Sequence, residues 1–408
     1  MRNLILLISG LILSFPLAAK PLGELFENTN LPVPTTKNQG VSRFEVYNNE
    51  LFVSTTDGIY KYMVDTKMWE PWAMKGVWVL DFVLNGDKII AIGNPDYVDL
   101  GASFQSARLI RGKIGSSEIE DITLSSMEYT LDEMTMTYLM NIAQKPSEPS
   151  TVICSSHGGI VRTDNFGETW YNICDFYYEY NPNQFLGWHP YLSDIIFYSS
   201  EDMILSPTML RSENDGRDWD FTDMYIDRDN SAHHIAFDSG DYNHMLLSGE
   251  GVIWESKDCG KSWEIVYNEY DPGNEDLNYA YSIMFDTFNQ NYAYCVGCLN
   301  GNEQKIVIFK SVDKGKSWYK ITESGSFLNH DYWVSEAILF NNKIFINTYG
   351  GIFTYDLTSE SGIEYLNNFE TSEEKPLYYN LRGDKLSNIP SNTIYIEKCG
   401  KNVKKRIK

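Results

Sequence analysis

TDNFGETW at residues 163–170, SENDGRDW at 212–219, SKDCGKSW at 256–263 and SVDKGKSW at 311–318 share one spacing of polar, glycine and tryptophan positions. Each begins with serine or threonine and has aspartate or asparagine at its third position, glycine at its fifth and tryptophan at its eighth. Aspartate and asparagine side chains bond nearby backbone amides in turns, and glycine accepts a positive φ. The tryptophan supplies an apolar body that can be buried between sheets. Because asparagine replaces aspartate in two copies, the pattern predicts a structural turn and not a catalytic carboxylate.

The spacing of the four copies indicates a repeated supersecondary unit. Trp170, Trp219, Trp263 and Trp318 are 49, 44 and 55 residues apart, and each copy follows an apolar strand, a turn, a second strand, a glycine-containing turn and a third strand. This pattern resembles the Asp-box, or BNR, repeat of sialidase-like β-propellers, and the last two copies match it fully. The resemblance implies that each copy joins the third and fourth strands of a blade. The structural residues would be Asn165, Gly167, Trp170, Asn214, Gly216, Trp219, Asp258, Gly260, Trp263, Asp313, Gly315 and Trp318.

The same order of strands and turns recurs without the repeat at residues 43–72, 79–122 and 336–357. Three such segments and four repeat copies make seven blades. We therefore predict an all-β fold: a seven-bladed β-propeller of four-stranded antiparallel blades within residues 20–365, followed by a short C-terminal β tail. A propeller closes on itself and so protects the edges of its sheets.

The two ends of the chain carry their own signals. Residues 1–19 have an early arginine, a short apolar run and small residues before Lys20, which is the layout of a cleaved signal peptide. Residues 366–408 contain a polar linker and then a tail that resembles the type IX sorting tails of exported Bacteroidetes proteins. A small β-hairpin with a solvated basic end is the alternative interpretation. We expect an exported protein, either secreted, at the cell surface or in the periplasm.

Composition restricts the partners of the mature chain. The net charge of −23 argues against nucleic-acid binding, which requires Lys and Arg to displace counterions from phosphates. After the leader, no segment is long and apolar enough to be membrane-embedded. Cys295 and Cys298 lie in a predicted strand, so buried thiols or a local disulfide are expected there and not a redox motif. We predict no cofactor, no metal site and a monomer.

The face opposite the repeat turns is the expected binding face, because the second-to-third-strand turns and the connections between blades lie there. Long aromatic-rich loops, such as residues 174–194, are assigned to it. Aromatic rings beside carboxylates suit sugars, and they equally suit protein partners or simple packing of the loops. The ligand-binding candidates are His157, Tyr177, Tyr178, Trp188, His189, Glu250, Asp331, Trp333 and Tyr349. A carbohydrate ligand is the first hypothesis, and a non-catalytic scaffold for a protein partner is the alternative.

Three carboxylates near the starts of predicted inner strands are candidates for catalysis: Asp81, Asp194 and Glu336. Two carboxyl groups at the right separation can divide the acid and base or nucleophile roles in glycoside cleavage, so a glycoside hydrolase-like activity would be the enzyme hypothesis. Catalytic sialidases of this fold carry an Arg-Ile-Pro-like motif in the first blade, whereas this chain has Ser42-Arg43-Phe44. A classical sialidase is therefore not expected.

Overall fold

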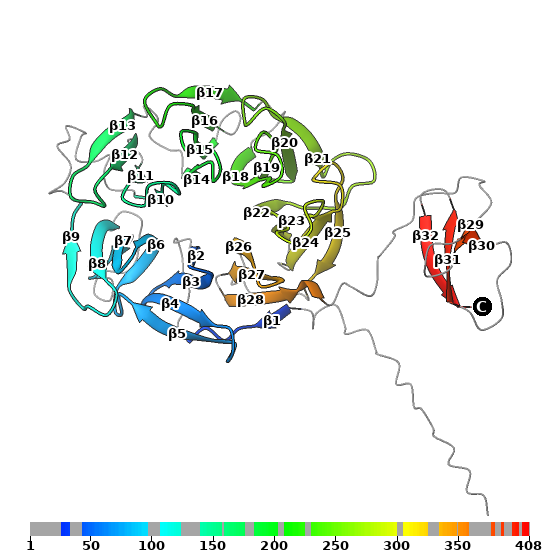
Figure 1. The fold of residues 1–408 in the computed structure, drawn as a ribbon, viewed down its shortest axis with the longest axis horizontal. Coiled ribbons are helices and arrows are strands. Elements are labelled where there is room, and N and C mark those ends of the chain that lie inside the picture. Colours follow the sequence, from blue (N-terminus) through cyan, green and yellow to red (C-terminus); the bar gives the residue numbers. More distant parts are fainter. Residues whose placement is uncertain are drawn as a thin grey trace, which may run out of the picture. The chain divides into compact units, whose positions relative to one another are not determined.

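The computed structural model describes residues 26–32, 43–96, 107–123, 139–156, 159–175, 183–202, 208–224, 230–299, 305–324, 334–348 and 350–358, and residues 377–379, 385–386, 394–399 and 402–407 of the tail. The chain divides into two compact units, Met1–Tyr355 and Asp356–Lys408. The first unit is a ring of seven antiparallel blades, which confirms the predicted fold class (Figure 1).

Each blade has four strands, with the first strand nearest the centre of the ring (Figure 1). Blades 1 to 3 contain β2 (Phe44–Tyr47), β3 (Glu50–Thr55), β4 (Gly58–Met63) and β5 (Met68–Ala73); β6 (Trp78–Asn85), β7 (Lys88–Asn94), β8 (Arg108–Lys113) and β9 (Ile119–Asp121); and β10 (Ile142–Gln144), β11 (Val152–Ser156), β12 (Gly159–Thr163) and β13 (Tyr171–Asp175). Blades 4 to 6 contain β14 (Asn183–Trp188), β15 (Ile196–Asp202), β16 (Thr208–Ser212) and β17 (Asp220–Asp223); β18 (Asn230–Phe237), β19 (Met245–Gly249), β20 (Val252–Ser256) and β21 (Glu264–Asn268); and β22 (Tyr279–Phe285), β23 (Ala293–Leu299), β24 (Lys305–Ser311) and β25 (Tyr319–Glu323). Blade 7 contains β26 (Val334–Phe340), β27 (Lys343–Thr348), β28 (Gly351–Asp356) and β1 (Phe26–Asn28).

The N-terminal strand closes the ring. β1 pairs antiparallel with β28, with Phe26 opposite Tyr355, so the first strand of the chain is the outermost strand of the last blade. Thr29, which follows β1, accepts a hydrogen bond from the indole of Trp69 in blade 1 at 2.9 Å. The sequence segment at 336–357 contains only three strands, and the fourth strand of blade 7 comes from the other end of the chain.

Apolar side chains between adjacent blades form the core. One cluster joins blades 2 and 3 and includes Trp78, Val161 and Trp170, all of which are buried. A second cluster joins blades 4 and 5 around Phe197 and Trp254. The inner strands β6 and β18 are buried along almost their whole length, so charged and polar residues within them stand out.

The four repeat turns share one set of hydrogen bonds. In the turn at 256–263, the Ser256 hydroxyl accepts the amide of Gly260, and the Asp258 carboxylate accepts the amide of Ser262. Asn165 and Asn214 accept the corresponding amides in their turns at 3.0 and 2.9 Å. The amide oxygen of asparagine thus makes the backbone hydrogen bond that aspartate makes.

The glycines of these turns also set the distance between blades. Gly260 has φ of +77°, and a Cβ there would lie 2.5 Å from the Phe197 ring of blade 4. Gly315 in blade 6 is similarly close to Leu246 of blade 5. Only glycine permits both the left-handed backbone and this approach. Each repeat turn therefore packs against the preceding blade. We call the side of the ring with these turns the turn face and the opposite side the loop face.

The second unit contains an antiparallel sheet in the order β30–β29–β31–β32. Its strands are β29 (Leu377–Tyr379), β30 (Lys385–Leu386), β31 (Ile394–Cys399) and β32 (Asn402–Ile407). Within the described parts of the chain, no helix has the length and apolar character needed to cross a membrane.

Candidate functional site

Seven residues, each in an inner strand or immediately before one, take corresponding places near the start of the seven inner strands. The inner strands β6, β14, β18, β22 and β26 each have a register irregularity near their start. Arg43 and Asn141 take the corresponding places in blades 1 and 3, because their carbonyls accept the amides of Ser54 and Ser155. The ring members, which we call the channel ring, are Arg43, Asp81, Asn141, Phe185, His234, Ser282 and Glu336.

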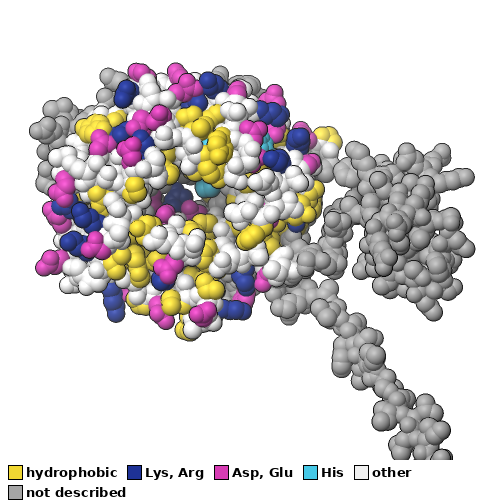
Figure 2. Space-filling model, viewed as in Figure 1, with side chains coloured by type: hydrophobic (Ala, Val, Ile, Leu, Met, Phe, Trp, Pro, Cys, Tyr) yellow, Lys and Arg dark blue, Asp and Glu magenta, His cyan; other side chains and the backbone are white. Residues whose placement is uncertain are grey.

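Arg43 reaches across this ring. Its Nη2 donates to Asn141 Oδ1 at 2.7 Å, although their blades are not adjacent, and its Nη1 lies 3.7 Å from Glu336 Oε1. Figure 2 shows the opening at the centre of the propeller, with cationic, acidic and histidine side chains inside it. The channel is therefore narrow at this level and lined by charge.

Most members of the channel ring also tie their own blade to the next one. Glu336 Oε2 accepts the amide of Phe44 at 2.5 Å, and Asp81 Oδ2 accepts the amide of Ile142 at 3.0 Å. Ser282 Oγ accepts the amide of Ala337 in the same way. Two of the three carboxylates that we considered for catalysis, Asp81 and Glu336, are thus brought together in the channel and hold backbone amides of neighbouring inner strands.

The channel carboxyl groups are hard to ionise. Glu45, two residues beyond Arg43 on β2, is half-buried, and burial together with the charges of Asp81 and Glu336 raises its pKa to about 8. Burial raises the pKa of Asp81 to about 6 against the opposing effect of Arg43 and two amides, and that of Glu336 to about 7. One arginine does not offset the desolvation of three carboxyl groups.

An aromatic column lies near the loop-face end of blades 5 and 6. The rings of His233 and Tyr281 are stacked at 4.7 Å with an interplanar angle of 15°, and Tyr279 stacks on Tyr281 at 6.0 Å and 14°. Glu250, in the turn between β19 and β20, forms a β-bridge with Tyr279, and its carboxylate accepts the hydroxyl of Ser231 at 3.2 Å. This places one of our ligand-binding candidates beside three aromatic rings.

His233 and His234 do not point to opposite faces, as simple strand alternation predicts. The register irregularity between Ala232 and His234 directs both rings toward blade 6. The Nδ1 atoms of His233 and His234 donate to the carbonyls of Ala280 and Ile283 at 2.8 and 3.0 Å. Burial lowers the pKa of both imidazoles to about 4, so they are neutral near pH 7. Among the described residues, no group of three His, Cys, Asp or Glu side chains gathers as a metal site.

Trp188, His189 and Asp194 lie on the turn face and not on the loop face where we expected them. The inner strand of blade 4 is β14, so Trp188 is its last residue and Asp194 lies in the turn to β15. The Trp188 indole donates to Asp215 in the repeat turn of the same blade at 3.0 Å, and the Asp194 carbonyl accepts the Asp215 amide. The expectation failed because residues 183–188 were assigned to an aromatic loop and the strand after them was assigned as the inner one.

The remaining ligand-binding candidates, His157, Tyr177, Tyr178, Asp331, Trp333 and Tyr349, lie outside the described residues. Conversely, the sequence reasoning did not select Glu45, Tyr279 or Tyr281. Sequence features could have indicated these residues: Glu45 is a charged residue between apolar neighbours in an inner strand, and Tyr279 and Tyr281 alternate at the start of β22.

Cys295 and Cys298 are buried free thiols within β23. Burial raises the pKa of Cys298 to about 12 and raises that of Cys295 as well. Neither thiol is therefore activated as a nucleophile.

Comparison with known proteins finds structures of similar fold but no matching family. No protein-family model and no curated protein sequence matches the chain. Among solved structures, the GH74 xyloglucanase from Xanthomonas campestris is 13% identical, with a TM-score of 0.55 over 91% of this chain and 59% of that one. YCF48 bound to D1 peptide is 13% identical, with a TM-score of 0.52 over 79% of this chain and 99% of that one. The extracellular domain of the putative hybrid two-component system BT4673 from B. thetaiotaomicron is 10% identical, with a TM-score of 0.54 over 91% and 44%. The chain thus spans about three-fifths of the xyloglucanase, and at these identities the likeness shows a β-propeller fold alone.

Proposed function

We propose that this protein is an exported, non-catalytic carbohydrate-binding propeller whose site is the loop-face mouth of its channel. The observation that carries the proposal is the aromatic column of His233, Tyr281 and Tyr279 beside Glu250. A tyrosine face can stack on the apolar C–H face of a pyranose, and a carboxylate accepts hydroxyl hydrogen bonds. Tyr279 and Tyr281 are both half-buried.

The contacts of the channel carboxylates favour binding over hydrolysis. Asp81 accepts two backbone amides, those of Phe82 and Ile142, and Glu336 accepts the amide of Phe44. A carboxylate used in glycoside cleavage must instead reach the scissile bond or its attacking water. The proposal therefore assigns Asp81 and Glu336 to holding the inner strands in place.

Export is part of the proposal. It is supported by the signal-peptide pattern at 1–19 and by the resemblance in fold to an extracellular domain. The fold resemblance to a xyloglucanase makes neutral plant-type glycans reasonable first ligands to test.

The test is a glycan screen of the full chain that includes xyloglucan oligosaccharides, followed by titration of the best ligand. Tyr281→Ala should weaken binding by up to about tenfold, because Tyr281 is the middle ring of the column and supports the ring of Tyr279, and one aromatic pair contributes roughly 0.5–1.5 kcal/mol. Tyr281→Trp should retain binding because it keeps an aromatic ring stacked on Tyr279.

Phe221→Ala is the matched control, because Phe221 is an exposed aromatic on the outermost strand β17. It should leave the affinity unchanged. Binding to no glycan, or equal binding by Tyr281→Ala and Phe221→Ala, would overturn the proposal.

A peptide ligand at the same mouth is the second candidate. The observation that favours it is the similar fold of YCF48, which is bound to a D1 peptide and whose length this chain covers almost completely. Tyrosine also dominates protein-binding hot spots. A peptide-library screen distinguishes the two, since a peptide that competes with no glycan but loses affinity in Tyr281→Ala would favour this candidate.

A further inference from the structure

The repeat turns on the turn face connect adjacent blades through two corresponding positions. The residue immediately before each turn belongs to the third strand: Arg162 in blade 3, Arg211 in blade 4 and Glu255 in blade 5. The fourth residue of the next blade's turn lies at the same interface, with φ near +60°: Asp215 and Cys259 contact Arg162 and Arg211, and Lys314 contacts Asp238, which His244 links to Glu255. The three interfaces differ in the charged side chains that they contain.

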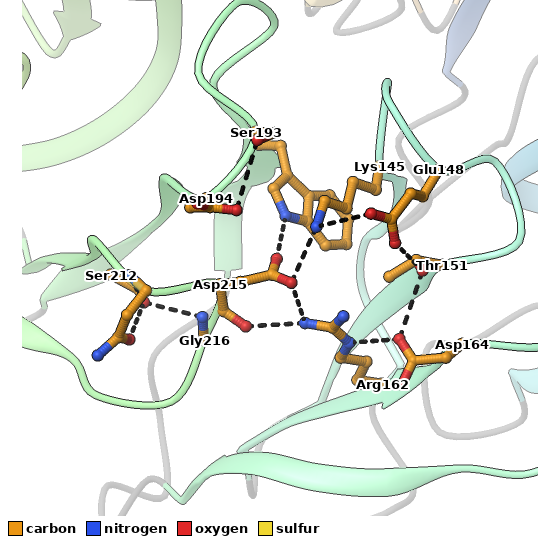
Figure 3. A network of polar contacts seen from close by, with 12 residues as sticks. Lys145, Glu148, Thr151, Arg162, Asp164, Ser193, Asp194, Ser212, Asp215 and Gly216 are labelled. Atoms are coloured by element: carbon orange, nitrogen blue, oxygen red, sulfur yellow. Dashed lines mark hydrogen bonds and ion pairs between the residues drawn. The ribbon is translucent and has the colours of Figure 1, made fainter.

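The interface of blades 3 and 4 is complete, with two cations around one carboxylate (Figure 3). Asp215 Oδ2 lies 2.9 Å from both Lys145 Nζ and Arg162 Nη1, and its Oδ1 accepts the Trp188 indole. Burial raises the pKa of Asp215, but hydrogen bonds from Lys145, Trp188 and Arg162 outweigh it and hold the pKa below its ordinary value. This carboxylate is supplied by the repeat turn itself.

At the interface of blades 5 and 6, the repeat turn supplies a cation and the preceding blade supplies the carboxylates. Lys314 of the repeat turn lies 2.9 Å from Asp238 Oδ2. His244 bridges Asp238 and Glu255: its Nδ1 lies 3.0 Å from Asp238 Oδ2, and its Nε2 lies 3.0 Å from Glu255 Oε1. Both carboxylates are buried, and each has a cation beside it: Lys314 for Asp238 and Lys257 for Glu255.

The interface of blades 4 and 5 has the cation but not the carboxylate. Arg211 corresponds to Arg162, and only 3% of it is exposed. Its Nε donates to the Cys259 carbonyl and its Nη1 to Glu213 Oε1, both at 2.6 Å. Within the described part of the chain, no oxygen accepts a hydrogen bond from its Nη2, and the guanidinium interacts with the thiol of Cys259. Where blade 4 presents the Asp215 carboxylate to Arg162, blade 5 presents the thiol of Cys259.

A hollow of about 490 Å³ lies at this interface. Its lining includes Leu192, Ile195, Arg211, Cys259 and the exposed cations Lys257 and Lys261. The volume is within the range of small-molecule sites. Lys261 and Arg211 both contact Glu213, and those hydrogen bonds keep the pKa of Glu213 below its ordinary value, so this carboxylate already uses part of the positive charge. Asp258, also in the lining, is held by its own turn.

A tyrosine pair adjoins the hollow. Tyr191 and Tyr242 are stacked at 4.9 Å with an angle of 16°, and about 43% and 45% of them are exposed. Their chain neighbours Leu192 and Asn243 line the hollow. His189 connects the backbones of the two tyrosines: its Nδ1 accepts the Tyr191 amide, and its Nε2 donates to the Tyr242 carbonyl. Because Nδ1 is an acceptor, the imidazole is neutral.

We propose that this hollow binds the carboxylate of an acidic sugar residue, which supplies to Arg211 the buried carboxylate that Asp215 supplies to Arg162. Nη2 of Arg211 donates to the ligand carboxylate, because guanidinium–carboxylate hydrogen bonds are strong and directional. Lys261 offsets the repulsion from Glu213. The tyrosine pair offers a flat surface for the sugar ring. The site is separate from the channel mouth and lies on the other face of the propeller.

The test is calorimetric titration of the full chain with glucuronate, with glucose as the uncharged comparison. Glucuronate should bind, and glucose should bind about tenfold more weakly or not measurably. Tyr281→Ala, in the channel-mouth site, should leave the glucuronate affinity unchanged, so that failure of one proposal is distinguishable from failure of the other. No binding of glucuronate, or equal binding of glucose, would overturn this inference.

Two variants locate the site. Cys259→Asp supplies the missing internal carboxylate, so it should abolish glucuronate binding while raising the melting temperature of the protein. Aspartate fits this left-handed position because Asp215 occupies the corresponding one. Arg211→Gln keeps a donor for the Cys259 carbonyl but removes the charge, and it should weaken glucuronate binding by about tenfold or more. Glucuronate binding that survives both substitutions places the ligand elsewhere and refutes the assignment.

Discussion

Carboxyl groups on the turn face and carboxyl groups in the channel experience opposite electrostatic environments. At the turn face, Asp215 and Asp238 have pKa values below the ordinary value, although burial acts to raise both. In the channel, Glu45, Asp81 and Glu336 have pKa values raised to about 8, 6 and 7, with burial as the largest cause. Both sets lie within the same ring of blades.

The number of partners explains the difference. Asp215 has an ammonium, a guanidinium and an indole N–H as donors, and Asp238 has Lys314, His244 and the amide of Gly240. In the channel, Asp81 and Glu336 share the guanidinium of Arg43 and a few backbone amides, and their charges raise the pKa of Glu45 further. Hydrogen bonds and ion pairs therefore offset the desolvation of the ionised carboxylates on the turn face, but only partly offset it in the channel.

The comparison indicates which carboxyl groups stabilise the fold. Groups with lowered pKa values stabilise the folded state when ionised, whereas groups with raised pKa values destabilise it when ionised. The turn face should therefore be sensitive to removal of a carboxylate. Ionisation of the channel carboxyl groups should destabilise the fold.

Removing the Asp215 carboxylate should have a large effect. Asp215→Ala leaves Lys145, 4% exposed, and Arg162, 10% exposed, without their shared counterion. We expect a loss of about 3 kcal/mol in the free energy of unfolding, measured by urea denaturation, because each buried cation keeps only a half-exposed counterion, Glu148 for Lys145 and Asp164 for Arg162. Asp215→Asn keeps an acceptor for the indole and should lose less. Losses below about 1 kcal/mol for Asp215→Ala would mean that solvent already screens this cluster.

The pH dependence of stability should reveal the channel. Because Glu45, Asp81 and Glu336 have raised pKa values, the folded state holds more protons than the unfolded chain between about pH 4 and pH 8. Stability should therefore fall as the pH rises through this window, by at most about 1.4 kcal/mol per pH unit for each group. Glu45→Gln should match the wild type near pH 4 and exceed it by about 2–4 kcal/mol at pH 8.5.

Urea denaturation of both proteins at pH 4.5, 6.5 and 8.5 measures this difference. Glu50→Gln is the control, since Glu50 is an exposed residue paired with Lys61, and its effect should be small at every pH. Parallel pH profiles for the wild type and Glu45→Gln would show that Glu45 is not held in a desolvated environment.

The sequence predicted the blades well because each blade repeats one local pattern. The turn spacing, the apolar strands and the glycine positions are all readable within about fifty residues. The closing strand β1 was missed because its partner β28 is more than three hundred positions away, and a three-residue strand has no periodicity of its own. Trp188, His189 and Asp194 were assigned to the wrong face because β14 and β15 are both apolar runs, and either could be the inner strand of blade 4.

The channel ring could be anticipated only in part. Asp81 and Glu336 stand out as charges in apolar strands, but the reach of Arg43 to Asn141 depends on the ring geometry. The difference between Asp215 and Cys259 was visible in the aligned turns. Its meaning required the structure, because only there does the fourth turn residue face the third strand of the preceding blade.

The smallest effect should come from exchanging aspartate for asparagine within a repeat turn. Asp313 Oδ1 accepts the Ser317 amide and the Ser311 hydroxyl at 2.9 and 2.8 Å, and its Oδ2 accepts the Ser317 hydroxyl at 2.6 Å. In the turn of blade 3, Asn165 makes the corresponding bonds and donates from Nδ2 to Thr169. Asp313→Asn should therefore change the free energy of unfolding at pH 7 by less than about 0.5 kcal/mol, whereas Asp313→Ala should lose about 1–2 kcal/mol with the amide unpaired. Equal losses for the two variants would show that the negative charge, and not the hydrogen-bond pattern, stabilises these turns.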